Sequence, residues 1–246
     1  MNPSSKSILP TVPGGLLLIN KPRGWRSFDV VRYFQQMTSM KKIGHSGTLD
    51  EAATGLMILA FGKDTSALNT LLNYSKSYLF RMTLGASSDT LDAHGSKWTW
   101  SKLDLNEISE ELIQYHIQTK FQGMIDQVPP IYSCLKKEGK RLHEYARKGV
   151  EISIEPRKIT IHSLSLISLI KQSYQPHMLF EVSCSSGTYI RSLCRDLGAC
   201  FGARAYLADL CRTSIGPFHF SQACPPRSIK SLQDLKNRLI SAQDLH

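Results

Sequence analysis

Side chains that can do chemistry concentrate between Lys42 and Gly55, in the segment KIGHSGTLDEAATG. This segment places a histidine, His45, and a carboxylate, Asp50, among glycines and hydroxyl side chains. A carboxylate with an ordinary pKa of about 3.9 is ionised at pH 7, so Asp50 is a candidate nucleophile or charge stabiliser that needs no activating base. The structural alternative is a glycine turn in which Asp50 caps a helix or the turn itself.

Two phosphate-handling motifs are excluded in this segment. A P-loop requires G-x-x-x-x-G-K-[ST], but six residues separate Gly55 from Gly62-Lys63, and Asp64 replaces the hydroxyl residue. An aspartyl phosphatase motif is excluded because Asp50 follows the glycine and no Mg²⁺-binding carboxylate pair accompanies it. The six cysteines form no C-x-x-C pair and no zinc-finger pattern. We therefore expect no metal, no cofactor, and a reduced cytoplasmic protein with mostly buried thiols.

The basic surplus of the chain indicates a nucleic-acid partner. Thirty lysines and arginines face 20 acidic residues, a net charge of +10 over 246 residues. Eight basic residues and four glutamates fall between Lys136 and Lys158. The longest apolar runs, 16–19 and the interrupted 164–170, are far shorter than the roughly 20 residues of a membrane span. The N-terminus lacks the apolar core of a secretory signal. Nucleic acid is thus favoured over a membrane surface.

The elements that must position these residues follow from hydrophobic periodicity. It predicts strands over 15–20, 56–61, 76–85, 158–169 and 178–184. It also predicts a helix that begins at Ser27 and further helices over 65–72, 104–121, 189–197 and 232–245. Residues 42–47 are predicted to be a glycine-rich loop and residues 1–14 a flexible arm. The irregular alternation predicts an α+β fold, a mixed and largely antiparallel sheet flanked by helices, in one domain over 15–246.

Five ordered blocks of this sequence resemble the TruB-type tRNA pseudouridine synthases. The segment 42–55 is similar to the family pattern G-H-x-G-T-L-D-P-x-A-T-G. The other blocks are GLLLINKPRG (15–24), KSYLFRMTLG (76–85) with Asp89-Thr90 and Asp92-x-x-Gly95, QVPPIYS (127–133) with Lys136, Gly139 and Ala146-Arg147-x-Gly149, and GTYIR (187–191) with Asp196-Leu-Gly198 and Leu210-x-Arg-Thr213. Blocks in this order over some 200 residues are far more specific than one short motif.

The resemblance implies an enzyme that isomerises the uridine at position 55 of the tRNA T-loop to pseudouridine, by base flipping and without a cofactor. It implies that Asp50 is the essential aspartate and that Arg191 pairs with it. Attack on the ribose C1′, attack on the uracil ring and deprotonation of C2′ all stay open for Asp50. Tyr78 matches a tyrosine that stacks on the target base and assists proton transfer at C5. The structural alternative for Tyr78 is a core tyrosine on a strand, and that for Arg191 is a surface arginine on a helix.

Further substrate contacts are implied by the same resemblance. His45 matches the histidine that displaces the base and fills its space, and Tyr189 and Leu210 match residues that line the uracil pocket. Thr48 belongs to the substrate-binding set, and Lys21 either supports the site, contacts phosphate or is plain surface. The basic insert over about 127–158 is expected to contact the T-arm phosphates.

Two of the departures from the family pattern bear most on function. Glu51 stands where proline is usual, which predicts a softer loop and an extra negative charge near Asp50. Only 26 residues follow Phe220, so a C-terminal RNA-binding domain of the PUA type is not expected. We expect a monomer. An rRNA or snRNA target is the alternative within the class, and a tRNA-binding or tRNA-folding protein without chemistry is the alternative outside it.

Overall fold

The computed structural model describes residues 12, 14–150, 152–171 and 175–242, so the predicted arm over 1–14 lies almost wholly outside the described residues. The chain divides into two compact units. Unit 1 is made of residues 1–74 and 214–246, and unit 2 of residues 75–213. In each unit antiparallel strands are covered by helices. This arrangement confirms the predicted α+β class with a largely antiparallel sheet.

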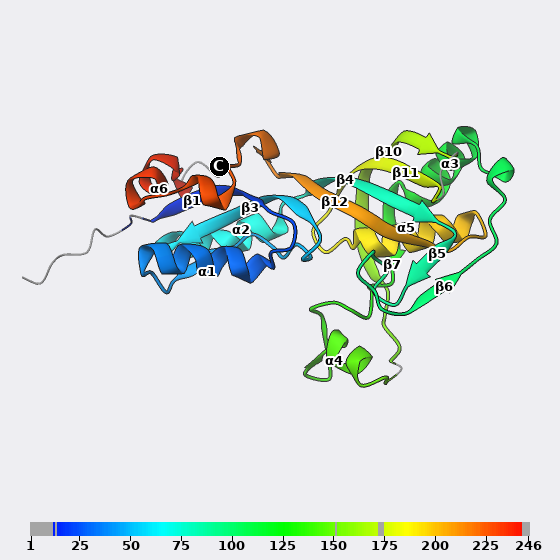
Figure 1. The fold of residues 1–246 in the computed structure, drawn as a ribbon, viewed down its shortest axis with the longest axis horizontal. Coiled ribbons are helices and arrows are strands. Elements are labelled where there is room, and N and C mark those ends of the chain that lie inside the picture. The colour runs from blue at the N-terminus through cyan, green and yellow to red at the C-terminus, as the bar shows by residue number, and fades with distance from the viewer. Residues whose placement is uncertain (1–11, 13, 151, 172–174, 243–246) are drawn as a thin grey trace, which may run out of the picture. The chain divides into compact units, whose positions relative to one another are not determined.

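Unit 1 is built around β3, an apolar strand that is buried on both faces. The elements of unit 1 are β1 (Gly15–Lys21), α1 (Ser27–Thr38), β2 (Ile43–His45), β3 (Thr54–Phe61), the 3₁₀ helix η1 (Gly62–Ala67), α2 (Leu68–Asn73), β13 (Phe218–His219), the 3₁₀ helices η4 (Phe220–Gln222) and η5 (Pro226–Ser228), and α6 (Leu232–Arg238). β1 runs antiparallel beside β3 along its length (Figure 1). Phe34 of α1 packs edge-on against Phe61, and Leu71 of α2 belongs to the same core cluster as Leu56.

Two predictions for unit 1 are wrong in part. Residues 43–45 form the short strand β2 rather than a loop, because their backbone pairs with β3 from Ile43↔Phe61 to His45↔Leu59. The last helix ends at Arg238, where a helix was predicted as far as 245. Ile240 instead exchanges two backbone hydrogen bonds of 2.9 Å with Leu16 of β1, which a continuing helix would prevent. Residues 243–246 lie outside the described residues.

Unit 2 contains a five-strand sheet in the order β12–β4–β11–β10–β7. The elements of unit 2 are β4 (Lys76–Leu84), β5 (Ala86–Ser88), β6 (Trp98–Trp100), the 3₁₀ helix η2 (Leu105–Glu107), α3 (Glu110–His116), the π-helix η3 (Ile117–Phe121), β7 (Gly123–Gln127), β8 (Lys136–Lys137), β9 (Lys140–Arg141), α4 (Leu142–Arg147), β10 (Arg157–Ile170), β11 (His177–Cys184), α5 (Ile190–Cys200) and β12 (Ala205–Ile215), whose last two residues belong to unit 1.

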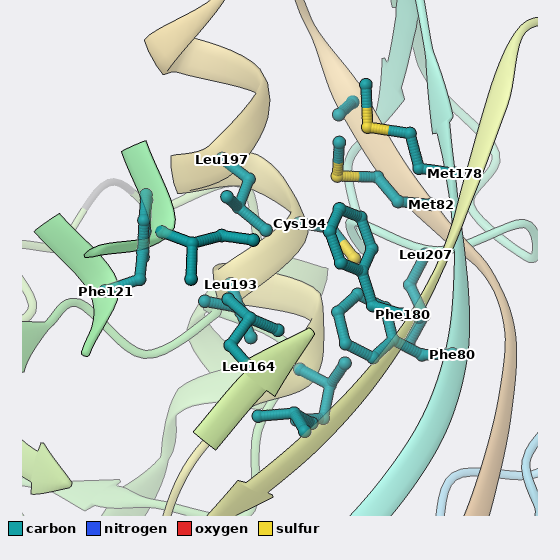
Figure 2. Close-up of a cluster of buried hydrophobic side chains, with 14 of the residues drawn as sticks. Phe80, Met82, Phe121, Leu164, Met178, Phe180, Leu193, Cys194, Leu197 and Leu207 are labelled. Carbon is teal, nitrogen blue, oxygen red and sulfur yellow. The ribbon is translucent and has the colours of Figure 1, made fainter. Parts of the chain in front are cut away.

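Helix α5 packs on one face of this sheet. Phe80 of β4 and Phe180 of β11 stack with ring centroids 5.2 Å apart, and Leu193, Cys194 and Leu197 of α5 point toward this aromatic pair (Figure 2). The helix lies close to β12, because a Cβ on Gly198 would come within 2.6 Å of the Cβ of Ala205. The predicted alternation of 76–85, with Tyr78, Phe80, Met82 and Leu84 on one face, is confirmed, because the last three belong to one core cluster and Tyr78 packs against it partly buried. This packing holds α5 against the sheet.

The helix predicted over 104–121 is interrupted in the structure. Ile108 is extended and buried, and Ser109 begins α3 by accepting a hydrogen bond of 3.1 Å from the Leu112 amide. A serine that caps a new helix competes with continuation of the preceding turn, which explains the break. Of the six cysteines three are buried and two half-buried, but Cys134 is exposed, against the expectation of mostly buried thiols for that residue. None of the described helices is long and apolar enough to span a membrane.

Candidate active site

The loop that carries Asp50 is fixed through its backbone. It connects β2 to β3, and Ser46 at its start bonds Ile58 of β3 twice, through its amide and its hydroxyl. The Ser27 hydroxyl donates to the Leu49 carbonyl at 2.9 Å and accepts from the Leu49 amide at 2.8 Å. Leu49 itself is buried. Leu49, the residue before the aspartate, is thus held through both its amide and its carbonyl, while the Asp50 side chain is half-buried.

Lys21 supports this loop through a hydrogen bond to the Glu51 carbonyl. Its side chain is fully buried, and its ammonium donates to the carbonyls of Pro22 at 3.1 Å, Trp25 at 2.5 Å and Glu51 at 3.2 Å. A buried charge of this kind is satisfied by hydrogen bonds rather than by solvent. Of the three roles left open by the sequence, support of the site is the one that fits, because a buried ammonium is not surface and does not reach a phosphate in solvent.

Glu51 keeps the backbone contacts expected at its position. Its carbonyl accepts from the Gly24 amide at 2.9 Å as well as from Lys21, and its side chain is exposed. Those contacts use only the carbonyl oxygen, which a proline would offer equally. The carbonyl contacts at this end of the loop are therefore compatible with either residue, and the softer loop stays a prediction.

His45 and Thr48 lie on the accessible side of the same segment. His45 ends β2 and is half-buried, and its Nδ1 accepts a hydrogen bond of 3.3 Å from the Gly47 amide. In the neutral ring this bond places the proton on Nε2. Gly47 has φ +122°, a conformation that favours glycine. Thr48 is exposed. Both side chains can therefore meet a substrate without unfolding the loop.

Arg191 is anchored at the start of α5 in unit 2. It is only 6% exposed, and its guanidinium donates to the carbonyls of Thr90 and Tyr132, each at 3.0 Å. The Asp92 carboxylate lies 3.9 Å from it. The alternative of a surface helix arginine is therefore excluded. Sequence reasoning gave Asp92 no role, although the Asp92-x-x-Gly95 pattern drew attention to it.

Tyr189 immediately precedes α5 and is held by a buried glutamine. The Gln127 side chain accepts from the Tyr189 amide at 2.8 Å and donates to the Tyr189 carbonyl at 3.1 Å. Burial raises the pKa of the Tyr189 hydroxyl, so this side chain stays neutral at physiological pH. Sequence reasoning missed Gln127, which it noted only as the first letter of a block.

Tyr78 and Leu210 are half-buried and pack against the core of unit 2. For Leu210 the core and substrate-pocket interpretations remain compatible. Tyr78 is hydrogen-bonded to Arg212, a guanidinium that is only 1% exposed. Lys76, two residues earlier on β4, is also buried, and burial together with the Arg212 charge lowers its pKa to about 8. Tyr78 thus lies in a cationic environment that its strand pattern did not reveal.

The basic segment 136–158 is largely solvent-exposed. A hairpin of two short strands, β8 and β9, leads into α4. Seven of its eight basic side chains are exposed, and Lys137, the eighth, donates to the Ser153 carbonyl at 2.6 Å. Of its four glutamates, Glu151 lies outside the described residues. Among the described residues no cluster of three or more His, Cys, Asp or Glu side chains could hold a metal ion.

Comparison with known proteins adds sequence and structural likeness. Residues 35–190 match the family model described as TruB family pseudouridylate synthase (N terminal domain). The chain is 40% identical over 224 residues to tRNA pseudouridine synthase B of Clostridium kluyveri, covering 90% of this chain and 74% of that relative. It is 38% identical over 239 residues to tRNA pseudouridine synthase B of Protochlamydia amoebophila, covering 96% and 87%.

Among solved structures, a chain of a Cbf5-Nop10-Gar1 complex superposes with a TM-score of 0.69 at 23% identity. The match covers 94% of this chain and 61% of that one, so the present chain spans less than two thirds of the solved chain. At this identity the likeness concerns the fold alone.

Proposed function

The chain belongs to the TruB family of pseudouridylate synthases and isomerises uridine to pseudouridine in tRNA, and we propose that its target is the uridine at position 55 of the T-loop. The position comes from the resemblance of the whole set of motifs to T-loop enzymes. The observation that carries the assignment of chemistry is the Asp50 loop, which fixes one half-buried carboxylate through Ser27, Lys21 and β3.

The proposed reaction leaves the atomic composition of the uridine unchanged. The N1–C1′ bond breaks, the uracil turns, and a C5–C1′ bond forms. The proton on C5 leaves and N1 gains one, so the product is an isomer and no oxidant or reductant enters. A carboxylate meets the need for a nucleophile, a base or a charge stabiliser at the sugar, and a fixed backbone holds it in the reactive geometry.

We propose that Asp50 is the essential group and that Arg191 keeps its carboxylate anionic and oriented. Arg191 suits that role because its two carbonyl contacts and Asp92 hold the guanidinium in one orientation. Tyr78 is proposed to stack on the uracil and to take the C5 proton. The Arg212 guanidinium interacts with the Tyr78 hydroxyl and can stabilise negative charge that develops on it during proton transfer. Tyr189 and Leu210 are proposed to line the uracil pocket.

The proposed RNA contacts lie on exposed side chains. His45 and Thr48 are proposed to contact the T-loop, with His45 filling the space that the flipped base leaves. The exposed lysines and arginines of 136–158 are proposed to bind T-arm phosphates. Lys21 acts on the loop rather than on the RNA, because it is buried.

Tritium release from RNA carrying [5-³H]uridine tests this proposal. We expect the wild type to release label from a T-arm stem-loop and to release none when cytidine replaces the uridine at position 55. A matched set of rRNA and snRNA stem-loops serves as the comparison. Faster release from one of those RNAs would overturn the T-loop assignment. Tight binding of the T-arm without any release would support an RNA-folding protein instead.

A further inference from the structure

The hairpin of β5 and β6 in unit 2 carries a row of aromatic side chains that the proposed catalytic set does not use. Trp98 and Trp100 lie on the same face of β6, as residues two apart on a strand do, with ring centroids 6.4 Å apart. Tyr206 of β12 packs edge-on against Trp98 at 5.0 Å. We call Trp98, Trp100 and Tyr206 the aromatic row. Indole rings gathered at a surface usually mark a contact with a partner.

The two tryptophans differ in how much of each is committed to the fold. Trp98 donates from Nε1 to the Gly95 carbonyl at 3.1 Å and is 36% exposed. Trp100 is 72% exposed, the largest exposure among the described large hydrophobic side chains. Trp98 therefore helps to build the hairpin, whereas most of the Trp100 ring faces solvent.

A cavity of about 410 Å³ borders Trp100. Its lining combines apolar side chains, among them Leu103 and Tyr206, with the polar Gln175. A cavity of this size accommodates a flat heterocycle with polar edges. The cavity and the exposed indole face together suit one unpaired nucleobase that stacks on the ring.

Exposed cations flank the row. Lys97, Lys102 and Arg204 are exposed, and the Arg204 amide donates to the Ser101 hydroxyl at 2.8 Å, which ties Arg204 to the residue after Trp100. The hairpin also carries Asp89 and Asp92. The carboxylate of Asp89 accepts from the amides of Ser96 and Lys97, and that of Asp92 from the His94 amide. Asp104 accepts from Asn106. These carboxylates therefore accept hydrogen bonds within the turns, and Lys97, Lys102 and Arg204 are exposed cations that a phosphate could reach.

From this geometry we propose that the aromatic row is a stacking platform for an unpaired segment of the RNA substrate, outside the nucleotides that react. The inference rests on the proposed function, because it takes RNA as the ligand. Base stacking on aromatic side chains tolerates any sequence, and flanking cations bind the phosphates. The hairpin also carries Thr90 and Asp92, which hold Arg191, so the platform and the catalytic arginine share one supporting element.

Binding of a short single-stranded RNA oligonucleotide by fluorescence anisotropy tests the platform. We expect Trp100→Ala to weaken binding about tenfold and Trp100→Phe to restore most of it, since the ring rather than the indole N–H makes the contact. Tyr115→Ala, which removes a 59% exposed aromatic from α3, is the matched control and should bind like the wild type. Equal loss in Tyr115→Ala, or no loss in Trp100→Ala, would overturn the proposal.

A second measurement distinguishes RNA stacking on the aromatic row from self-association through the row and from an effect on pseudouridine formation. With Trp25 and Trp98 changed to Phe, Trp100 is the only tryptophan left, and RNA should quench its fluorescence. Trp100→Ala should still form pseudouridine in a T-arm stem-loop without unpaired tails at the wild-type rate. Failure of the wild type in that assay contradicts the proposed function instead. A change of oligomeric state in Trp100→Ala, without quenching by RNA, would make the row a self-association surface and overturn the proposal.

Discussion

The Asp50 loop and the basic segment 136–158 differ in how firmly the rest of the fold holds them. The first is held by reciprocal backbone bonds from Ser27 and by the buried ammonium of Lys21. The second exposes nearly all its cationic side chains and has only short elements of its own. A reacting carboxylate needs one geometry, whereas phosphate binding needs charge and reach. The comparison teaches that rigidity is concentrated where chemistry is proposed.

Asp50→Asn should give the largest effect. The amide preserves size but lacks the negative charge, so the single-turnover rate should fall by at least about 10³-fold, while the tRNA dissociation constant changes less than about twofold. Quenched-flow kinetics with tritiated tRNA and filter binding measure the two. A comparable loss of binding would show that Asp50 belongs to the RNA-contact surface rather than to the chemistry.

The triple variant Lys136→Ala, Lys140→Ala and Arg141→Ala should show the converse pattern. We expect KM for tRNA to rise about tenfold with kcat unchanged, and the slope of log Kd against log salt to fall by about two or three. The control changes three other cations, Lys41, Lys230 and Arg238, to alanine. If the control weakens binding as much, the general net charge and not this segment holds the RNA.

Lys21→Met tests the rigidity of the loop. Removing the ammonium takes away the hydrogen bond that it donates to the Trp25 carbonyl and one of the hydrogen bonds to each of the Pro22 and Glu51 carbonyls. We therefore expect about 2 kcal/mol less stability and a rate lowered about tenfold. Urea unfolding and kcat report the two quantities, with the exposed Lys41→Met as the control. Ser27→Ala should cost less, about 1 kcal/mol. Unchanged kcat in both variants would contradict the idea that these contacts position Asp50.

Lys76→Met should give the smallest effect, visible as a pH dependence. The Lys76 pKa is lowered to about 8 by burial, so above about pH 8 the folded state binds fewer protons than the unfolded one. The cost of burying the charge of Lys76 is therefore relieved progressively as pH rises from about 8 toward its unfolded pKa, so the stability of the wild type rises over that interval. The stability of Lys76→Met relative to the wild type should decline over that interval in urea titrations. A constant difference would mean that Lys76 titrates normally.

Much of the fold followed from local pattern. The alternation of β4 and the continuous apolar run of β3 each indicate their burial, since one or both faces of a strand must be apolar. The errors in unit 1 came from contacts with residues outside the local sequence window, whereas the break in the helix predicted over 104–121 came from the local Ser109 cap. Ile240 pairs with Leu16, and residues 43–45 pair with β3, and neither partner is visible within a sequence window.

The candidate site was predicted unevenly for the same reason. Asp50 and Arg191 stand in motifs, so their positions were predicted from the sequence. Three features of the site were not predicted, because each joins segments that are distant in sequence or depends on burial. They are the burial of Lys21, the hydrogen bonds between Gln127 and Tyr189, and the pairing of Tyr78 with Arg212. The aromatic row was missed because Trp98 and Trp100 match no motif, and only their exposure marks them.

Pseudouridine mapping of unmodified tRNA at single-nucleotide resolution tests the central claim most directly, with the wild type and Asp50→Asn treated side by side. We expect one new pseudouridine, at position 55 of the T-loop, in the wild-type sample and none in the Asp50→Asn sample. Pseudouridine at another position, or equal modification by Asp50→Asn, would contradict it.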